Sequence, residues 1–546
     1  MKRTTQLGVA LALAATVLTA FAPAVAAAND AGGPMIVDLK APATPDQLRA
    51  LEAAGLNGVH GYKHLPVAAG NLPQGRLPYV KALGFVVGVR PDTIKTPTAV
   101  TVEGSLASNP TAVANTWNLD FIDAEKSGAT GQGAYVALLD AGLLPMWRDL
   151  LDETHVRIDL GRAFTGHNGN PVPDQLENDR NGHGTATAAT IIGYKLHDKS
   201  VTGGFLLDSA TGTPGEYLVP GVAPKATIIP IRVCDVGMYC WDSSIYSGLD
   251  YAVGLKLGDE ANGELAGAPI VINMSLGGST YSFAEEAVYE YVVSQGVLVV
   301  ASAGNDGPNP MGWPGAYPVV ISAGAGGWRK QWYGAHDSIN NQWWMDDVAE
   351  GAAAANEWFM IWWSGVENPN VVPGHPEIGQ ELDVVAPGRF LLLPYIADGK
   401  AYPPADPNPP ANVPSPYFFI SGTSFSAPTT TGVVALLLSK NPDLTQAQVE
   451  QILRSTALPL SEGCWYATFP YAANNCWDTS KSLGGPGHVT GWGLVQADGA
   501  VAAVLALKTT LIFSPEERTR IMGYVVGSLR QIPPFRMLGN RGHGTR

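Results

Sequence analysis

The chain has 546 residues, of which 46% are apolar and 15% charged, which is typical of a globular protein with a large core. Its 33 basic and 48 acidic residues give a formal net charge of −15. This acidic balance argues against nucleic acid or an anionic membrane surface as the main partner, and it does not indicate a substrate.

Residues 1–28 are typical of a secretory signal peptide. They contain a basic start (Lys2 and Arg3), an apolar core (residues 7–21) and a cleavage region of small residues (Ala24–Ala28). The apolar core is short for a membrane-spanning helix, and no later run is both long and uniformly apolar. We therefore expect a secreted protein whose mature form has no membrane anchor.

Residues 29–110 are expected to form a small separate unit. Strand-like runs (35–39 and 85–89) alternate with helix-like runs (44–55 and 74–84), which predicts a compact α+β module. Residues 93–110 are rich in Thr, Pro, Ser and Gly, and are predicted to be a linker.

From Trp117 onward, apolar runs rich in Val and Ile alternate with runs of helical spacing. The apolar runs are 134–139, 226–233, 269–274, 297–301 and 319–323, and the helical runs include 243–257 and 282–295. Continuous apolar runs are typical of strands that are covered on both faces. The pattern predicts an α/β domain, a parallel sheet with helices on both faces, whose site lies at the carboxyl ends of the strands.

Residues 418–440 begin as an apolar run, break near Gly422, and continue as a long helix without a polar face. Ser424 falls in the first turn of that helix, where unpaired N–H groups favour negative charge. Pro428 is expected to mark the helix start, because proline is tolerated there. Taken alone, Ser424 is most simply an N-cap residue.

Three other polar residues give Ser424 a second interpretation. Asp140 ends an apolar strand, Asn305 follows another, and His183 precedes a helical run. A serine hydroxyl becomes a good nucleophile when an imidazole takes its proton and a carboxylate orients that imidazole. An asparagine amide and a helix-start N–H can stabilise the oxyanion that forms.

Seven motifs, in chain order, resemble the subtilisin-like serine proteases, the subtilase family. They are Val136-Ala-Leu-Leu-Asp140-Ala-Gly142, Gly182-His183-Gly-Thr185, Gly221-Val-Ala-Pro224, Ser275-Leu-Gly-Gly278, Ala303-Gly-Asn305, Ala386-Pro-Gly388 and Gly422-Thr-Ser424-Phe-Ser-Ala-Pro428. The order Asp, His, Ser is also that of subtilisin. The resemblance implies a subtilisin-like fold over residues 111–504 and a serine endopeptidase that acts on proteins or peptides.

The resemblance also implies a role for each matching residue. Ser424 is the expected nucleophile, His183 the general base and acid, Asp140 the orienting carboxylate, and Asn305 with the Ser424 N–H the oxyanion hole. Ser275, Leu276, Gly277 and Gly278 match the strand that pairs with substrate. Gly277 and Gly312 match the pocket for the residue before the cut, and their small size predicts a preference for large apolar side chains.

The N-terminal unit resembles the subtilase propeptide, a ferredoxin-like inhibitor and folding aid. The resemblance implies a precursor that processes itself and is inhibited by its own propeptide. The alternative is a binding domain that the mature protein retains.

The four cysteines fall as two close pairs, Cys234/Cys240 and Cys464/Cys476. In an exported protein, local disulfides are the expected use, although four cysteines allow three connectivities. The implied chemistry requires no cofactor. A structural Ca²⁺ is compatible with the resemblance, because Asp149 occupies a place where several relatives bind calcium.

Insertions near 203–219, 328–379 and 394–416 interrupt the family pattern. The second holds seven of the 14 tryptophans, which are expected to pack a satellite core; the alternative is a recognition surface. Residues 505–546 form a C-terminal extension of unknown role.

Two alternatives to hydrolysis are compatible with the same motifs. A catalytically silent subtilase fold could serve binding, but the complete set of Asp140, His183 and Ser424 argues against it. A peptide ligase or cyclase would share the acyl-enzyme, and the sequence does not separate it from a hydrolase.

Overall fold

The structure, a computed structural model, describes most of the chain between residues 32 and 512. The described ranges are 32–98, 101–105, 116–197, 216–306, 311–328, 351, 357–360, 382–396, 417–460, 464–465, 475–476 and 490–512. The expected signal peptide and residues 513–546 lie outside them. Within the described residues, no helix has the length and apolar character needed to cross a membrane.

An eight-stranded sheet forms the centre of the larger domain. Its order is β17-β16-β15-β13-β7-β11-β8, with β18 also paired to β16. Every pair is parallel except β16–β17, so seven of the eight strands are parallel and the predicted α/β fold is confirmed. The bounds are β7 Tyr135–Asp140, β8 Arg162–Ala163, β11 Thr227–Arg232, β13 Ile270–Met274, β15 Val297–Ser302, β16 Ile321–Trp328, β17 Trp358–Met360 and β18 Val384–Pro387.

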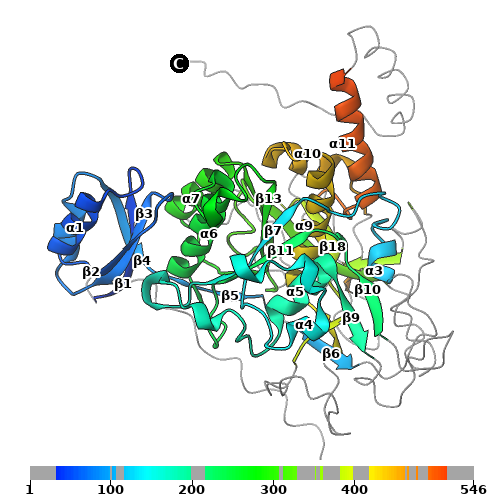
Figure 1. The fold of residues 1–546 in the computed structure, drawn as a ribbon, viewed down its shortest axis with the longest axis horizontal. Helices are drawn as coiled ribbons and strands as arrows, with labels where there is room; N and C mark the ends of the chain where they lie inside the picture. The colour runs from blue at the N-terminus through cyan, green and yellow to red at the C-terminus, as the bar shows by residue number, and fades with distance from the viewer. Residues whose placement is uncertain are drawn as a thin grey trace, which may run out of the picture.

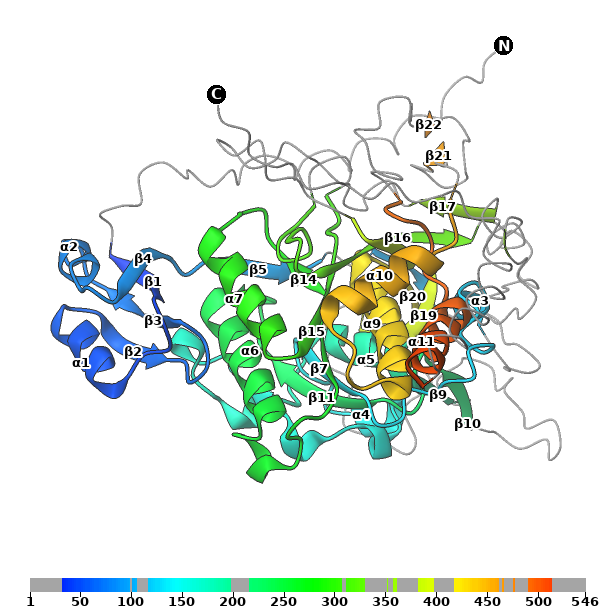
Figure 2. The same cartoon turned by 90° about the horizontal axis from the view of Figure 1, so that it is seen from above.

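Helices cover both faces of this sheet. Figure 2 shows α6 and α7 on one side of β15, β7 and β11, and α5 and α9 on the other. The helices of the domain are α3 Trp117–Asp120, α4 Trp147–Leu150, α5 His183–Ile192, α6 Asp242–Leu257, α7 Phe283–Ser294, α9 Thr423–Lys440, α10 Gln446–Thr456 and α11 Ala497–Ile512. Smaller strands lie around the sheet: β9 Gly193–His197, β10 Glu216–Pro220, β12 Cys240–Trp241, β14 Leu276–Gly277, β19 Leu391–Pro394, β20 Tyr417–Ser421, β21 Cys464–Trp465 and β22 Asn475–Cys476.

Helix α9 is the buried centre of its layer. It is buried from Thr423 to Leu438 and packs against β13, β15, β16, β18, α5 and α11. A helix without a polar face is stable only when it is enclosed in this way.

Pro428 lies in the second turn of α9, so the expectation that it marks the helix start is wrong by about one turn. Proline has no N–H to donate to the carbonyl four residues earlier, which here is that of Ser424. The Ser275 hydroxyl donates to that carbonyl instead, at 2.8 Å. The side chain of Ser275 therefore supplies the bond that Pro428 omits.

The N-terminal unit is a four-stranded antiparallel sheet of order β2-β3-β1-β4 with two helices. Its elements are β1 Gly33–Leu39, α1 Pro45–Ala53, β2 Asn57–Gly61, β3 Val67–Leu72, α2 Leu77–Lys81 and β4 Val86–Pro91. Strands β2 and β3 are absent from the sequence prediction. Thr44 caps α1 in a reciprocal capping box with Gln47, which explains why that helix was recognisable.

The two faces of this small sheet belong to two different cores. One face packs against α1 and α2 with a separate apolar cluster that includes Val37, Leu51 and Val80. The other face carries Ile36, Val67 and Ala69, and these residues join the main core together with Tyr62 and Leu65 of the loop between β2 and β3. The unit is therefore docked on the larger domain rather than tethered beside it, next to α6 and α7 in Figures 1 and 2.

Asp250 on α6 fixes one loop of the N-terminal unit. Its carboxylate accepts the backbone N–H groups of Lys63, His64 and Leu65 at 3.0, 2.7 and 3.1 Å. Nearby, the Tyr62 hydroxyl donates to the carbonyl of Ser243 at 2.9 Å. Hydrogen bonds to a charged acceptor are stronger than neutral ones, so this is a specific contact.

The predicted linker at 93–110 is wrong in part, because the chain there forms two strands. Strand β5 (Ile94–Pro97) pairs antiparallel with both β12 and β14, and β6 (Thr101–Ser105) pairs antiparallel with β20. These strands are only four and five residues long, and each mixes strand-favouring Ile, Val or Thr with strand-disfavouring Pro, Lys, Glu or Gly. Here the extended conformation comes from main-chain partners that are distant in sequence.

Two of the seven clustered tryptophans, Trp328 and Trp358, are among the described residues, and both are buried in the main core rather than in the satellite core that was expected. The Trp328 indole stacks on Trp117 and donates to Glu357 at 2.8 Å, and Trp358 packs beside Phe121. The other five lie outside the described residues, as do residues 198–215 and 397–416. Helix α11 continues to Ile512, past the predicted end of the domain at 504.

We predict that Asp250→Ala loosens the loop at residues 63–65. The test uses a chain that also carries Ser424→Ala, which removes the expected nucleophile. Three amides lose a charged acceptor at a cost of about 1–3 kcal/mol, so hydrogen exchange at residues 63–65 should be about 5- to 150-fold faster. Asp259→Ala is the control, because its carboxylate pairs with the Lys63 side chain instead of with amides. Unchanged exchange in Asp250→Ala would contradict the docking role.

Candidate active site

Asp140 and His183 meet where β7 ends and α5 begins. The Nδ1 of His183 lies 2.7 Å from Oδ1 of Asp140, and the two side chains are 1% and 2% exposed. The backbone N–H of His183 donates to the Asn181 side chain at 2.8 Å, which helps to fix the start of α5. The expected carboxylate–imidazole pair is thus formed.

The Asp140 carboxylate has two further donors. The Ala141 N–H lies 2.6 Å from Oδ1, and the Thr187 hydroxyl, which also lies 2.9 Å from the Gly184 carbonyl oxygen, lies 3.3 Å from Oδ2. Thr187 follows His183 by four residues on α5, so both side chains lie on one face of the helix. The sequence analysis did not single out Thr187, although this spacing could have revealed it.

Two glycines allow the strand end and the helix start to approach each other. A Cβ atom on Gly184 would overlap the carbonyl oxygen of Gly142. This contact explains why glycine flanks both Asp140 and His183 in their motifs: the backbones must touch for the side chains to meet.

Burial and the charge of Asp140 have opposite effects on the pKa of His183. Burial lowers the pKa of His183, but the charge and hydrogen bond of Asp140 raise it, and the net pKa lies above its ordinary value of 6.5. Asp179, fully buried four residues before His183, has its pKa raised to about 6 by burial. The Asp140 carboxylate therefore favours the protonated imidazole that proton transfer would create.

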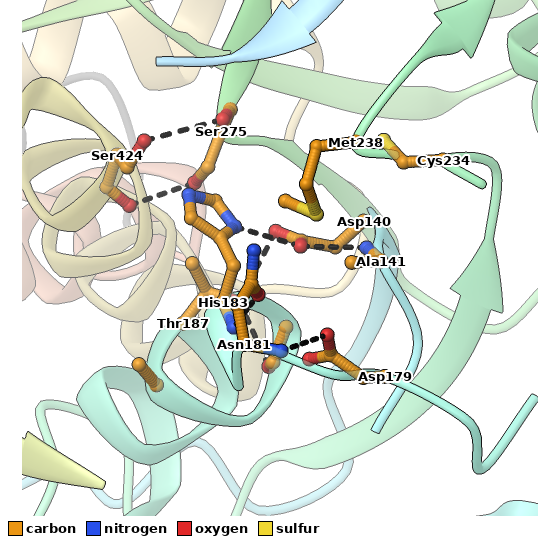
Figure 3. A network of polar contacts seen from close by, with 12 residues as sticks. Asp140, Ala141, Asp179, Asn181, His183, Thr187, Cys234, Met238, Ser275 and Ser424 are labelled. Carbon is orange, nitrogen blue, oxygen red and sulfur yellow. Dashed lines mark hydrogen bonds and ion pairs between the residues drawn. The ribbon is translucent and has the colours of Figure 1, made fainter. Parts of the chain in front are cut away.

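Ser424 is the second residue of α9, and Figure 3 shows the His183 ring between Asp140 and Ser424. The Ser424 hydroxyl contacts the Thr98 hydroxyl, lies 3.1 Å from the Thr98 carbonyl oxygen, and lies 3.3 Å from the Ser275 carbonyl oxygen. Within the described residues, the buried Nε2 of His183 has no hydrogen-bond partner. The Ser424 hydroxyl is therefore directed at Thr98 and the Ser275 carbonyl. The expected hydrogen bond between this hydroxyl and Nε2 of His183 is not formed in this structure.

Asn305 lies just beyond β15, beside the start of α9. Its side-chain oxygen accepts the Thr423 N–H at 3.0 Å and the Thr423 hydroxyl at 2.7 Å. Because the oxygen is held by Thr423, the amide end of Asn305 is oriented by these bonds. Thr423 is a second residue that the sequence analysis did not single out, although it directly precedes Ser424.

The predicted substrate strand is occupied by the chain itself. Leu276 and Gly277 of β14 pair antiparallel with Pro97 and Thr96 of β5, and the Thr98 N–H donates to the Ser275 carbonyl at 3.3 Å. The site thus contains an extended peptide held by main-chain bonds, which is how sheet edges bind peptides.

The small residues predicted to line a pocket also lie together. Gly278 and Trp313 exchange both backbone hydrogen bonds at 2.8 Å, and Gly304 and Gly277 lie against the backbone of Gly312. The structure therefore brings Gly277 and Gly312 side by side next to β14.

On the far side of Thr98, the N-terminal segment forms a second paired strand, β6. Strand β6 runs antiparallel to β20, with Thr101 opposite Ser421 and Val102 opposite Ile420. Because β20 leads directly into the turn before Ser424, the chain is paired on both sides of that serine. Thr98 lies between the two pairings.

The cysteine pairs have different standing in the structure. Cys234 and Cys240 form a disulfide that closes the loop before β12. Cys464 and Cys476 lie opposite each other in the β21–β22 pair, and the bond between them stays a prediction.

No group of three or more His, Cys, Asp and Glu side chains suited to a metal ion occurs among the described residues. The insertion predicted near 203–219 lies largely outside those residues. The calcium expectation is therefore untested.

Several known proteins are similar to this chain in sequence. Subtilisin NAT from Bacillus subtilis subsp. natto is 29% identical over 350 residues, covering 62% of this chain and 64% of that protein. Fervidolysin from Fervidobacterium pennivorans is 27% identical over 398 residues, covering 71% of this chain and 44% of that protein. This chain thus aligns with less than two thirds of the length of either relative.

A solved structure of fervidolysin, described as a keratinolytic enzyme related to subtilisin, has the same fold. It matches with a TM-score of 0.56 at 22% identity, covering 87% of this chain and 61% of that one. A family model for the subtilase family matches residues 131–493. That match covers more than half of the chain and contains Asp140, His183, Asn305 and Ser424, so the chain belongs to the subtilase family.

Proposed function

We propose that the chain is a secreted serine endopeptidase, made as a precursor that cuts itself after Thr98 and then hydrolyses peptide bonds in proteins or peptides. The observation that carries this proposal is the position of Thr98. Its carbonyl oxygen is 3.1 Å from the Ser424 hydroxyl, and the chain is strand-paired before and after it. We interpret the peptide bond after Thr98 as a substrate bond that is already bound next to the nucleophile.

We assign each side chain a role that its position in the site supports. The Ser424 oxygen attacks the carbonyl carbon of the residue before the cut, while Nε2 of His183 takes the hydroxyl proton. Asp140 holds the imidazole in position through Nδ1 and stabilises its positive charge. The Asn305 amide and the Ser424 N–H stabilise the oxyanion.

The same groups then complete the reaction. His183 returns the proton to the leaving amine, so the peptide C–N bond breaks and an acyl-enzyme remains on Ser424. Water, deprotonated by His183, attacks this ester and releases the acid. Thr187 and Thr423 act as positioning residues, since they hold Asp140 and Asn305 respectively.

The N-terminal unit has the features of an inhibitor. Its apolar face is buried against the larger domain and its β5 strand lies in the cleft, so no other peptide can pair with β14 while it is bound. Its order of elements, β1-α1-β2-β3-α2-β4, agrees with the expected ferredoxin-like propeptide. Cleavage after Thr98 would shorten the predicted propeptide of residues 29–110 to residues 29–98.

The preference for large apolar residues before the cut rests on Gly277 and Gly312 and stays a proposal. Thr98 itself is small and does not match this preference. A self-cleavage site is cut only once in each molecule, so it need not be a preferred substrate. A peptide library with strict selection for Arg or Lys at that position would contradict the apolar preference.

Calcium is kept as a structural proposal, since the proposed chemistry assigns every step to protein side chains and water. A melting temperature that falls on addition of a chelator, and is restored by Ca²⁺, would support a bound ion.

We predict that Ser424→Ala abolishes both fluorophosphonate labelling and self-cleavage. Removing the hydroxyl removes the attacking atom, so the secreted variant should keep its N-terminal unit and begin near Asn29. Wild type should begin at Ala99 by N-terminal sequencing. Labelling that persists in the variant would refute the assignment, and a wild-type start near Asn29 would indicate a retained domain. A product mass without the added water would indicate ligation instead of hydrolysis.

We predict that His183 titrates above pH 6.5 in the Ser424→Ala precursor, followed by NMR of its imidazole, because Asp140 raises its pKa. Only the neutral imidazole takes a proton, so wild-type kcat/KM should fall about tenfold per pH unit below its midpoint. The control Asp140→Asn should lower the midpoint. A midpoint below 6.5 in the precursor would show that burial outweighs the charge of Asp140.

We predict that Asn305→Ala lowers kcat with little change in KM, because its amide acts on the oxyanion and not on the bound substrate. Loss of such a donor from subtilisin, a member of this family, costs about 10²- to 10³-fold in kcat, and that known case sets the scale. Asn441→Ala, at the far end of α9, is the control. A change confined to KM would assign Asn305 to substrate binding instead.

A further inference from the structure

Strand β5 buries a lysine and exposes an isoleucine. Lys95 is 3% exposed, whereas Ile94 beside it is 41% exposed. Lysine is almost never fully buried unless its charge is paired. The surroundings of Lys95 must therefore be suited to a cation.

Two carboxylates hold the Lys95 ammonium group. Its Nζ lies 2.5 Å from Oδ1 of Asp242 and 2.6 Å from Oε1 of Glu285, and these side chains are 1% and 2% exposed. Burial lowers the pKa of Lys95, but Asp242 and Glu285 raise it by more, so the amine stays charged.

Both carboxylates are fixed by the larger domain. Asp242 is the first residue of α6 and Glu285 lies in the first turn of α7, where helix dipoles favour negative charge. The Tyr317 hydroxyl lies 3.1 Å from the Glu285 carboxylate. Asp242 and Glu285 form the pocket around the Lys95 ammonium group. This pocket is thus part of the domain that remains after cleavage.

The register of β5 gives Lys95 a place in the substrate sequence. Thr98 is the residue before the proposed cut, so Lys95 is the fourth residue before it. Its backbone pairs with Cys240, and its side chain passes the Cα of Gly278 on the opposite strand. Any peptide paired in the same register would direct its own fourth residue into this pocket.

The cations that neutralise the pocket leave with the N-terminal unit. Arg90 of β4 lies 3.5 Å from Asp242, and its guanidinium also bonds Asp38 and the Tyr246 hydroxyl. Once Arg90 and Lys95 depart, Asp242 and Glu285 face the cleft without either cation. Two neighbouring carboxylates then favour a cationic ligand.

We propose that Asp242 and Glu285 make the enzyme select substrates with lysine at the fourth residue before the cut. This inference rests on the proposed peptidase function and adds a charge requirement at a second position. The competing explanation is that the acids serve only to dock the N-terminal unit. In that case the mature enzyme would show no preference at this position.

The test uses mature enzyme and acylated tetrapeptides of sequence Xaa-Thr-Pro-Thr joined to a fluorogenic amide. Xaa is lysine, norleucine, leucine or glutamate; norleucine keeps the carbon chain of lysine and lacks the ammonium. The lysine peptide should have a kcat/KM at least about 10-fold above that of norleucine, and glutamate should be the poorest, because sites built for polar groups discriminate strongly. This comparison needs no variant, so misfolding cannot obscure it.

Variants then assign the preference to the two acids. Asp242→Asn and Glu285→Gln should each reduce the lysine-to-norleucine ratio, and Glu290→Gln, an exposed acid on the same helix α7, should keep it. A wild-type ratio of one or below overturns the proposal while leaving the peptidase function intact. If no peptide is cut and no fluorophosphonate labelling occurs, the peptidase function itself fails, and the lysine preference fails with it.

Discussion

The hydrogen bond from the Ser275 hydroxyl to the Ser424 carbonyl joins the two elements on which the candidate site depends. Ser275 also accepts a bond from the Asn273 amide at 3.0 Å, and the Asn273 oxygen accepts the Thr431 hydroxyl at 3.0 Å. All four residues are fully buried. A buried polar network whose members are satisfied fixes one arrangement, because every displacement exposes an unpaired group.

This network links β13 and the residues after it to helix α9. The link exists because Pro428 cannot donate to Ser424 and leaves that carbonyl for Ser275. The same serine therefore couples the peptide-binding strand to the nucleophile-bearing helix. The geometry between a bound peptide and the Ser424 hydroxyl is set by this link rather than by flexible loops.

The sequence predicted the parts of the fold whose signals are local. The apolar strands around β7, β13 and β15 were recognisable because both of their faces are covered, and helix α1 because of its capping box. Strands β2 and β3 are rich in Gly, Ala and Asn and have no such signal. Strands β5 and β6 resembled a linker, since their conformation depends on partners that belong to other parts of the chain.

The residues of the candidate site also differ in whether a local sequence signal revealed them. Asp140, His183, Asn305 and Ser424 were found because each lies at the end of an element that its own neighbours define. The pairing of Lys95 with Asp242 and Glu285 was not found, because Lys95 and Asp242 are 147 positions apart and neither lies in a distinctive motif. Only the register of β5 against β12 and β14 brings these charges together.

The contacts of Lys95 also tie the maturation of the protein to its specificity. One pair of carboxylates holds the N-terminal unit in the precursor and then faces incoming peptides in the mature form. A redesign that made this pocket apolar would leave Lys95 buried without a counter-charge and would disturb the precursor before any substrate was met. Engineering or evolution of the pocket must therefore change residue 95 together with Asp242 and Glu285, so the precursor segment constrains which specificities can be reached.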